Sequence, residues 1–124
     1  MEGVIMAQES TGQWEAPVSA VSKKNPIPAD AHSLALGKEV FEENCLPCHG
    51  ASGRGDGPAS KALTKKPGNL TDAKRMETQT DGALYWKIGE GSNPMPEFKD
   101  ALTDDQRWEV INYVKTLARK DNNH

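Results

Sequence analysis

The sequence predicts an all-α domain that follows an extended tail. Residues 33–44 and 103–119 place apolar side chains one helical turn apart along a single face. No run alternates polar and apolar residues as a half-buried strand does. Prolines and glycines interrupt the rest of the chain, which predicts loops between the helices. A length of 124 residues suits one domain.

The first 30 residues show no helical periodicity, and we expect them to form the extended tail. Trp14 is the one large aromatic residue of this tail, and we expect it to pack on the domain. The domain itself is expected at residues 31–120, with a polar end at residues 121–124.

The first helix is expected at residues 33–44, with Ser33 as its N-cap. A glycine inside a helix lowers helix stability relative to alanine. We therefore expect Gly37 to allow the close approach of another element. A narrow stripe at i, i+3, i+4 and i+7 is formed by Gly37, Val40, Phe41 and Asn44.

The middle of the chain is rich in glycine and proline. A loop is expected from Gly50 to Pro58, then a short helix at residues 59–63 and a second loop through Pro67 and Gly68. The next helix is expected from an N-cap at Thr80 to a glycine at 89 or 91.

The last helix has the clearest pattern. Thr103 and Gln106 form a capping box. One apolar face is formed by Val110, Ile111, Val114, Leu117 and Ala118.

The run Cys45-Leu46-Pro47-Cys48-His49 lies directly after the first helix and is the attachment signature of a c-type haem. Each thiol can form a thioether to a vinyl group of the haem, and the histidine becomes the proximal iron ligand. A thioredoxin-like site would need a strand before the motif. A zinc site would need four ligands, and a disulfide would leave His49 unexplained. We therefore predict one covalent haem c per chain.

The composition agrees with a haem protein. Hydrophobic residues make up 35% of the chain and the mean hydropathy is −0.72, so an apolar cofactor would complete a small core. The net charge of −3 argues against a nucleic-acid partner. Residues 54–75 are mainly basic and residues 77–109 mainly acidic. Two ordinary solvated faces are the favoured explanation, and a dipolar surface that orients the protein at a redox partner is the alternative.

The sixth iron ligand is predicted to be Met95, because Pro94 and Pro96 hold it in a rigid loop. Met76 and His32 are weaker alternatives, and Met1 and Met6 lie in the tail. The second ring nitrogen of His49 needs a partner, and a backbone carbonyl is the usual one. Pro58 is our candidate for that carbonyl.

These residues resemble the class I monohaem cytochromes c of bacterial respiratory chains. The resemblance covers residues 33–119 and rests on the Cys-x-x-Cys-His run, Gly57-Pro58, Met95-Pro96 and the last helix. It implies three to five helices around the haem, with the first and last helices crossing. It also implies that Gly37, Phe41 and Tyr113 meet at that crossing, and that Pro58 offers its carbonyl to the proximal histidine.

The predicted function is one-electron transfer in a respiratory chain, without enzymatic activity. The expected donor is a quinol-oxidising complex or a dehydrogenase, and the expected acceptor is a terminal oxidase or reductase. The protein is expected to be a monomer.

We expect a periplasmic location, because haem attachment normally occurs outside the cytoplasmic membrane. The first residues lack the apolar region of a secretory signal, so a trimmed chain with a few cloning residues is expected. Two alternatives remain open: a haem domain of a larger membrane-bound redox enzyme, and a haem sensor or peroxidase with a labile sixth ligand.

Overall fold

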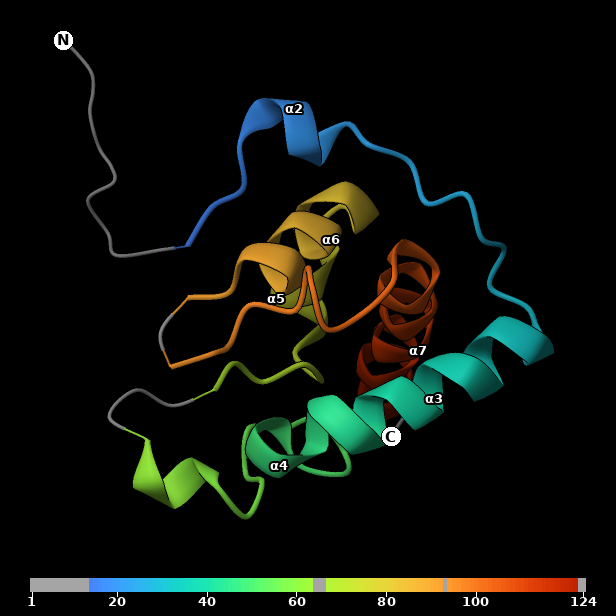
Figure 1. The fold of residues 1–124 in the computed structure, drawn as a ribbon. Helices are drawn as coiled ribbons and strands as arrows, with labels where there is room; N and C mark the ends of the chain where they lie inside the picture. The colour runs from blue at the N-terminus through green and yellow to red at the C-terminus, as the bar shows by residue number, and fades with distance from the viewer. Residues whose placement is uncertain (1–13, 64–66, 93, 123–124) are drawn as a thin grey trace, which may run out of the picture.

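A computed structural model of the chain describes residues 14–63, 67–92 and 94–122. The described residues form helices and contain no strand, which confirms the all-α prediction (Figure 1). None of these helices has both the length and the apolar character needed to cross a membrane. The elements are α2 (Val18–Val21), α3 (Ala31–Asn44), α4 (Leu46–His49), the 3-10 turn η1 (Ser60–Ala62), α5 (Ala73–Glu77), α6 (Asp81–Glu90) and α7 (Asp104–Asn122).

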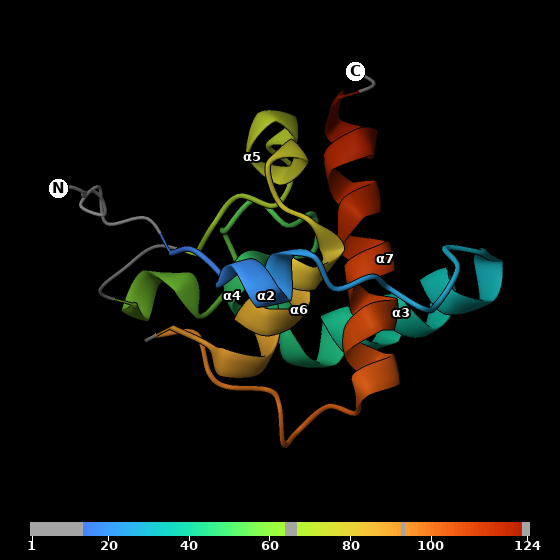
Figure 2. The ribbon, with the colours of Figure 1, turned by 90° about the horizontal axis from the view of Figure 1, so that it is seen from above.

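Helices α3 and α7 cross and form the centre of the core (Figure 2). Gly37 lies at the crossing, where a β-carbon would overlap the backbone carbonyl of Glu109 and lie 2.9 Å from the β-carbon of Tyr113. The rings of Phe41 and Tyr113 meet beside it at a centroid distance of 5.5 Å. The close approach predicted for Gly37 is therefore confirmed. All five residues of the predicted apolar face of α7 are buried: Val110, Ile111, Val114, Leu117 and Ala118.

Side-chain caps fix where α3, α6 and α7 begin. The Thr103 hydroxyl accepts from the Gln106 N–H at 3.1 Å, and the Gln106 side chain accepts from the Thr103 N–H at 2.8 Å, so the capping box of α7 is confirmed. Thr80 caps α6 as predicted, by accepting from the Ala83 N–H. The prediction for α3 was wrong by three residues: Asp30 is the N-cap and accepts from the Ser33 N–H, because the Ser33 hydroxyl is buried and donates to the Pro28 carbonyl.

Two further differences concern short helices. The helix expected at residues 59–63 is the 3-10 turn η1. Helix α5 was not predicted; Asp72 caps it by accepting from the Arg75 N–H. It places Met76 in the core, where 9% of the residue is exposed.

The two terminal parts of the described chain, residues 14–30 and 121–122, contain more helix than the sequence predicts. Residues 18–21 form α2 rather than extended chain. Trp14 packs on the domain as expected, with its ring centroid 6.5 Å from that of Trp86. Helix α7 continues to Asn122, so the first half of the predicted polar end is helical. Met1 and Met6 lie outside the described residues.

Candidate haem site

The attachment motif lies on the one-turn helix α4, directly after α3. Cys45 ends α3, and its N–H donates to the Phe41 carbonyl at 2.8 Å. The His49 N–H donates to the Cys45 carbonyl at 2.9 Å, which closes the next turn. Positions three apart on a helix lie on the same face. The two thiols, both free and half-buried, therefore suit attachment to one planar group.

The Cys45 thiol lacks the electrostatics of a reactive thiol in a dithiol redox site. Burial, and to a smaller extent the neighbouring Cys48, raise the pKa of the Cys45 thiol to about 12. Reactive Cys-x-x-Cys pairs have a lowered thiol pKa. The environment of Cys45 therefore argues for attachment rather than thiol–disulfide exchange.

His49 is held with one ring nitrogen available. Its Nδ1–H donates to the Gly68 carbonyl at 3.1 Å, so the lone pair lies on Nε2. Burial lowers the pKa of His49, the Gly68 bond opposes that change, and the charge of Arg75 lowers the pKa further. A neutral, oriented imidazole is what iron ligation requires. The residues present thus fit a c-type haem.

The carbonyl partner of His49 is not the one we predicted. Pro58 is exposed, and the structure pairs His49 Nδ1 with the Gly68 carbonyl instead of the Pro58 carbonyl; the residue before Pro58, Gly57, packs against the attachment turn. The Gly57 N–H donates to the Cys48 carbonyl at 3.0 Å, and a β-carbon there would overlap the Pro47 carbonyl. The acceptor instead comes from the next loop, at Gly68.

Two residues near His49 were missed by the sequence reasoning. A β-carbon on Gly68 would lie 2.8–3.2 Å from the guanidinium atoms of Arg75, so this side chain packs directly on Gly68. The Leu70 N–H donates to the Gly53 carbonyl at 2.6 Å, which joins the two loops. The Pro67-Gly68 turn in the sequence was the available signal for Gly68, whereas Arg75 had none.

Met95 lies in a closed turn after α6. The Ser92 N–H donates to the Met95 carbonyl at 3.1 Å, and the Met95 N–H donates to the Ser92 carbonyl at 2.7 Å. The Met95 side chain is half-buried and, like Cys45, packs against the main core cluster. Met76 belongs to that core itself, which explains it as a packing residue. His32 is exposed at the start of α3.

The aromatic residues of α6 and α7 contact one another. Tyr85 stacks on Trp108 at a centroid distance of 4.1 Å. The Tyr85 hydroxyl donates to Asp104 at 2.5 Å and accepts from Arg107 at 2.9 Å. This hydroxyl thus already donates one hydrogen bond and accepts another, and the cluster links the two helices.

Comparison with known proteins gives consistent matches. The family model for cytochrome c matches residues 34–118. Cytochrome c6 of Leptolyngbya boryana is 38% identical over 86 residues, which cover 69% of this chain and 94% of the relative. Cytochrome c6 of Thermosynechococcus vestitus is 33% identical over 90 residues, or 73% of this chain and 75% of the relative.

Two solved structures share the fold. A chain of the reducing HAO-like protein complex of Kuenenia stuttgartiensis matches with a TM-score of 0.65 and 32% identity over 74% of this chain. This chain spans 46% of that one, or about half its length. The c-type cytochrome KustC0563 matches with a TM-score of 0.58 and 23% identity, over 65% of this chain and 95% of its own.

Proposed function

This chain belongs to the cytochrome c family, and from that premise we propose that His49 and Met95 would be the two protein ligands of its haem iron. The protein is a one-electron carrier with a covalently bound haem c and is not an enzyme. Cys45 and Cys48 supply the two thioether sulfurs. The haem supplies a one-electron iron couple, and the roles proposed below belong to the protein's own residues.

The observation that carries this proposal is the bond between His49 Nδ1 and the Gly68 carbonyl. It sets the tautomer: the proton is on Nδ1, so Nε2 carries the lone pair that can bind iron. It also raises the basicity of the imidazole, as outer hydrogen bonds to ligating histidines generally do.

The role of Met95 follows from its turn. A thioether is a weak ligand, so the cost of ordering its loop must be small for it to stay bound. The paired backbone bonds already fix Met95 to Ser92, just after the end of α6. A neutral sulfur ligand favours ferrous iron and raises the reduction potential.

Replacing Met95 by alanine tests the assignment in the full-length holoprotein. We expect loss of the weak near-infrared band of iron–methionine ligation, binding of carbon monoxide by the ferrous protein, and a fall in potential on the order of 0.1 V or more. Met76→Leu is the matched control, since this volume-conserving change lies in the core and should leave band and potential in place. An unchanged band and potential in Met95→Ala would refute the assignment. Carbon monoxide binding by the unsubstituted ferrous protein would instead favour the sensor or peroxidase alternative.

The partners are proposed by class. The donor is a quinol-oxidising complex or dehydrogenase and the acceptor a terminal oxidase or reductase, on the extracytoplasmic side of the membrane. The exposed basic residues Lys61, Lys74 and Arg75 support a charge-guided encounter, and redox interfaces of this kind are small and weak. Stopped-flow reduction by a purified quinol-oxidising complex should slow as salt increases. Rates independent of salt would contradict the charge-guided encounter, and absence of reduction would contradict the donor.

A second candidate is a subunit or domain of a larger redox assembly. It is favoured by the 32% identity to one chain of an HAO-like complex, because that chain is about twice as long as the region that matches. Sedimentation of the native protein separates the two candidates: a single monomeric species supports the free carrier, and a larger complex supports the assembly.

A further inference from the structure

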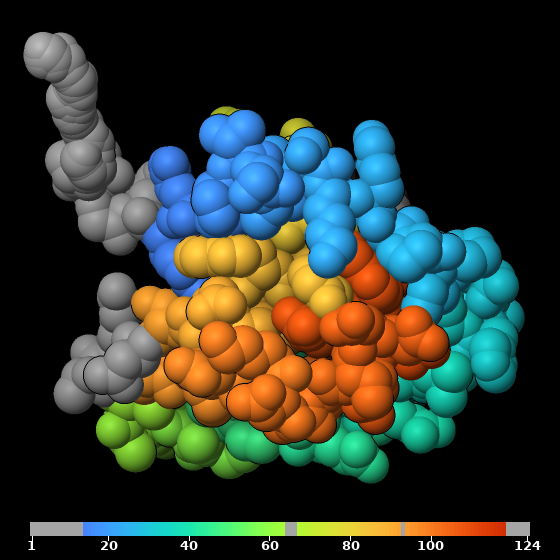
Figure 3. Space-filling view, turned by 45° about the horizontal axis from the view of Figure 1, so that its top comes forward, coloured from blue at the N-terminus to red at the C-terminus, as the bar shows by residue number. Residues whose placement is uncertain are grey.

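The N-terminal segment, residues 14–30, lies outside the region that the cytochrome c family model matches. In the structure this segment lies along α6 and continues past α7 (Figure 3). Its side of the molecule includes the first turn of α6, which is the helix that leads to Met95.

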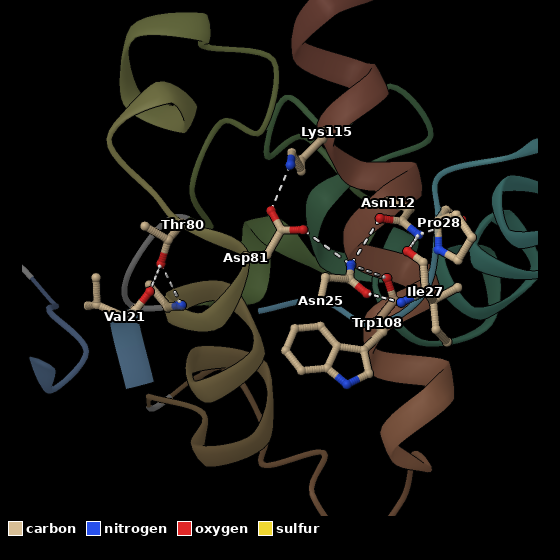
Figure 4. A network of polar contacts seen from close by, with 10 residues as sticks. Val21, Asn25, Ile27, Pro28, Thr80, Asp81, Trp108, Asn112 and Lys115 are labelled. Atoms are coloured by element: carbon tan, nitrogen blue, oxygen red, sulfur yellow. Dashed lines mark hydrogen bonds and ion pairs between the residues drawn. The ribbon is translucent and has the colours of Figure 1, made fainter. Parts of the chain in front are cut away.

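Asn25 is the centre of the contact (Figure 4). Its Nδ2 lies 3.2 Å from Asp81 Oδ2 on α6 and 3.0 Å from Asn112 Oδ1 on α7. Asp81 also accepts from Lys115 of α7 at 2.6 Å through its other oxygen. The half-buried Asn25 amide thus joins both helices, and Asn112, which is 5% exposed, donates back to the Ile27 carbonyl.

The backbone of the segment also contacts the first turn of α6. The Thr80 hydroxyl, which caps α6, donates to the Val21 carbonyl at 2.8 Å. A β-carbon on Gly82 would overlap the Ala20 carbonyl and lie 2.6 Å from the Lys23 carbonyl. The segment is therefore seated directly on the helix backbone at a position where only glycine leaves room.

The opposite end of α6 sets the place of Met95. The Gly91 N–H donates to the Lys87 carbonyl at 2.9 Å, and the Phe98 N–H donates to the Ile88 carbonyl at 3.1 Å, so the Met95 loop leaves and rejoins α6 at its last turn. A ten-residue helix is a stiff rod about 15 Å long. A rotation permitted at its first turn would consequently displace the loop at its last.

We propose that Asn25 is a positioning residue for the iron ligand: the N-terminal segment fixes the first turn of α6 to α7 and so holds Met95 at the iron. This inference rests on the proposed function, in which Met95 is the sixth ligand. Asn25 acts through α6 and touches neither the attachment motif nor Met95 in any contact of the described residues.

The experiment measures how fast imidazole replaces the sixth ligand in full-length ferric holoprotein, since that rate reports dissociation of the methionine. Asn25→Ala should raise the rate about tenfold, because it removes the polar link at the far end of α6. Asp30→Ala is the matched control: it removes a hydrogen bond made by the same segment, but to α3. We expect less than a twofold change for this control.

Gly82→Ala provides an independent variant if Asn25→Ala folds poorly. Alanine stabilises the helix itself but displaces the Ala20 carbonyl, and with it the N-terminal segment. If the segment only contributes to overall stability, Gly82→Ala should not speed the replacement of the sixth ligand by imidazole. If the segment positions Met95, Gly82→Ala should speed that replacement. Equal acceleration by Asn25→Ala and Asp30→Ala would show general loosening and overturn the proposal. Unchanged rates in Asn25→Ala and Gly82→Ala would also overturn it.

Met95→Ala in the same assay separates this proposal from the ligand assignment. If its rate equals that of the unsubstituted protein, Met95 is not the ligand and the proposed function fails. If Met95→Ala binds imidazole rapidly while Asn25→Ala behaves like the unsubstituted protein, only the positioning role fails.

Discussion

Replacing Gly37 by alanine tests whether the crossing of α3 and α7 depends on backbone contact. The new β-carbon would lie 2.7 Å from the carbonyl carbon of Glu109 and 2.9 Å from the β-carbon of Tyr113, whereas ordinary contacts begin at 3.4 Å. The first of these atoms belongs to the backbone and the second is bonded directly to it, so no side-chain rotation relieves the overlap. The helices must separate by about 0.5–1 Å, which forfeits a quarter to a half of the dispersion energy at the affected contacts.

The size of the effect follows from two opposing terms. Overpacking costs about 1–3 kcal/mol, and we expect the upper end because the overlap involves backbone. The gain in helix propensity from glycine to alanine is about 1 kcal/mol. The net loss of unfolding free energy is therefore about 2 kcal/mol, equivalent to a fall in Tm of roughly 8 °C for a domain of this size.

Guanidinium unfolding of the ferric holoprotein, followed by tryptophan fluorescence, measures this difference. Ala35→Gly is the control for propensity, because Ala35 is exposed on the same helix and its replacement should cost about 1 kcal/mol. The slope of the unfolding free energy against guanidinium concentration should be unchanged. A Gly37→Ala protein as stable as the unsubstituted one, or more so, would show that the helices can separate freely and refute the reasoning.

Two further predictions concern α6 and α7. Gly91 has φ +69° and ψ 173°, a region restricted to glycine, so Gly91→Ala should cost about 1–3 kcal/mol and weaken the near-infrared band; a stable variant with a full band would contradict this. The hydrogen bond from Tyr85, and then the charge of Arg107, hold the pKa of Asp104 below its ordinary value of 3.8. The stability that Asp104 contributes is therefore complete above pH 3.8 and lost as the pH falls through the lowered pKa. Urea unfolding at several pH values should show Asp104→Asn less stable than the unsubstituted protein above pH 3.8, and equally stable below the lowered pKa of Asp104. A difference in unfolding free energy that does not change with pH would contradict a stabilising role of the ionised Asp104.

The helices that the sequence predicted well are those with strong local signals. The capping box at Thr103 and Gln106 fixed the start of α7, and the apolar periodicity after it predicted the buried face. The haem-attachment residues Cys45, Cys48 and His49 could be proposed from sequence because they lie within five consecutive positions, so their proximity does not depend on the rest of the fold. The role of Gly37 could be predicted because glycine destabilises a helix interior, so its presence there indicated that another element packs closely against it.

The predictions that failed depend on contacts distant in sequence. Gly57-Pro58 and Pro67-Gly68 both combine a proline with a flexible residue, and nothing local decides which loop faces His49. The choice is made by packing, since Gly57 is held against the attachment turn and the second loop is joined to the first through Leu70 and Gly53. Helix α5 has only five residues, so periodicity cannot reveal it, and isolated helices of that length are unstable in water.

The N-terminal segment shows why composition alone is a poor guide to order. Its prolines predicted an extended tail, and residues 22–30 do lack helix, but an extended segment can still be packed on the domain. Residues 25–28 place two backbone carbonyls and one amide against Asn112, on a helix more than 80 residues away. Polar partners at that separation leave no periodic trace in the sequence. They nevertheless satisfy a buried amide that would otherwise cost about 1–3 kcal/mol, so the segment is part of the domain and should not be removed when the electron carrier is truncated for study.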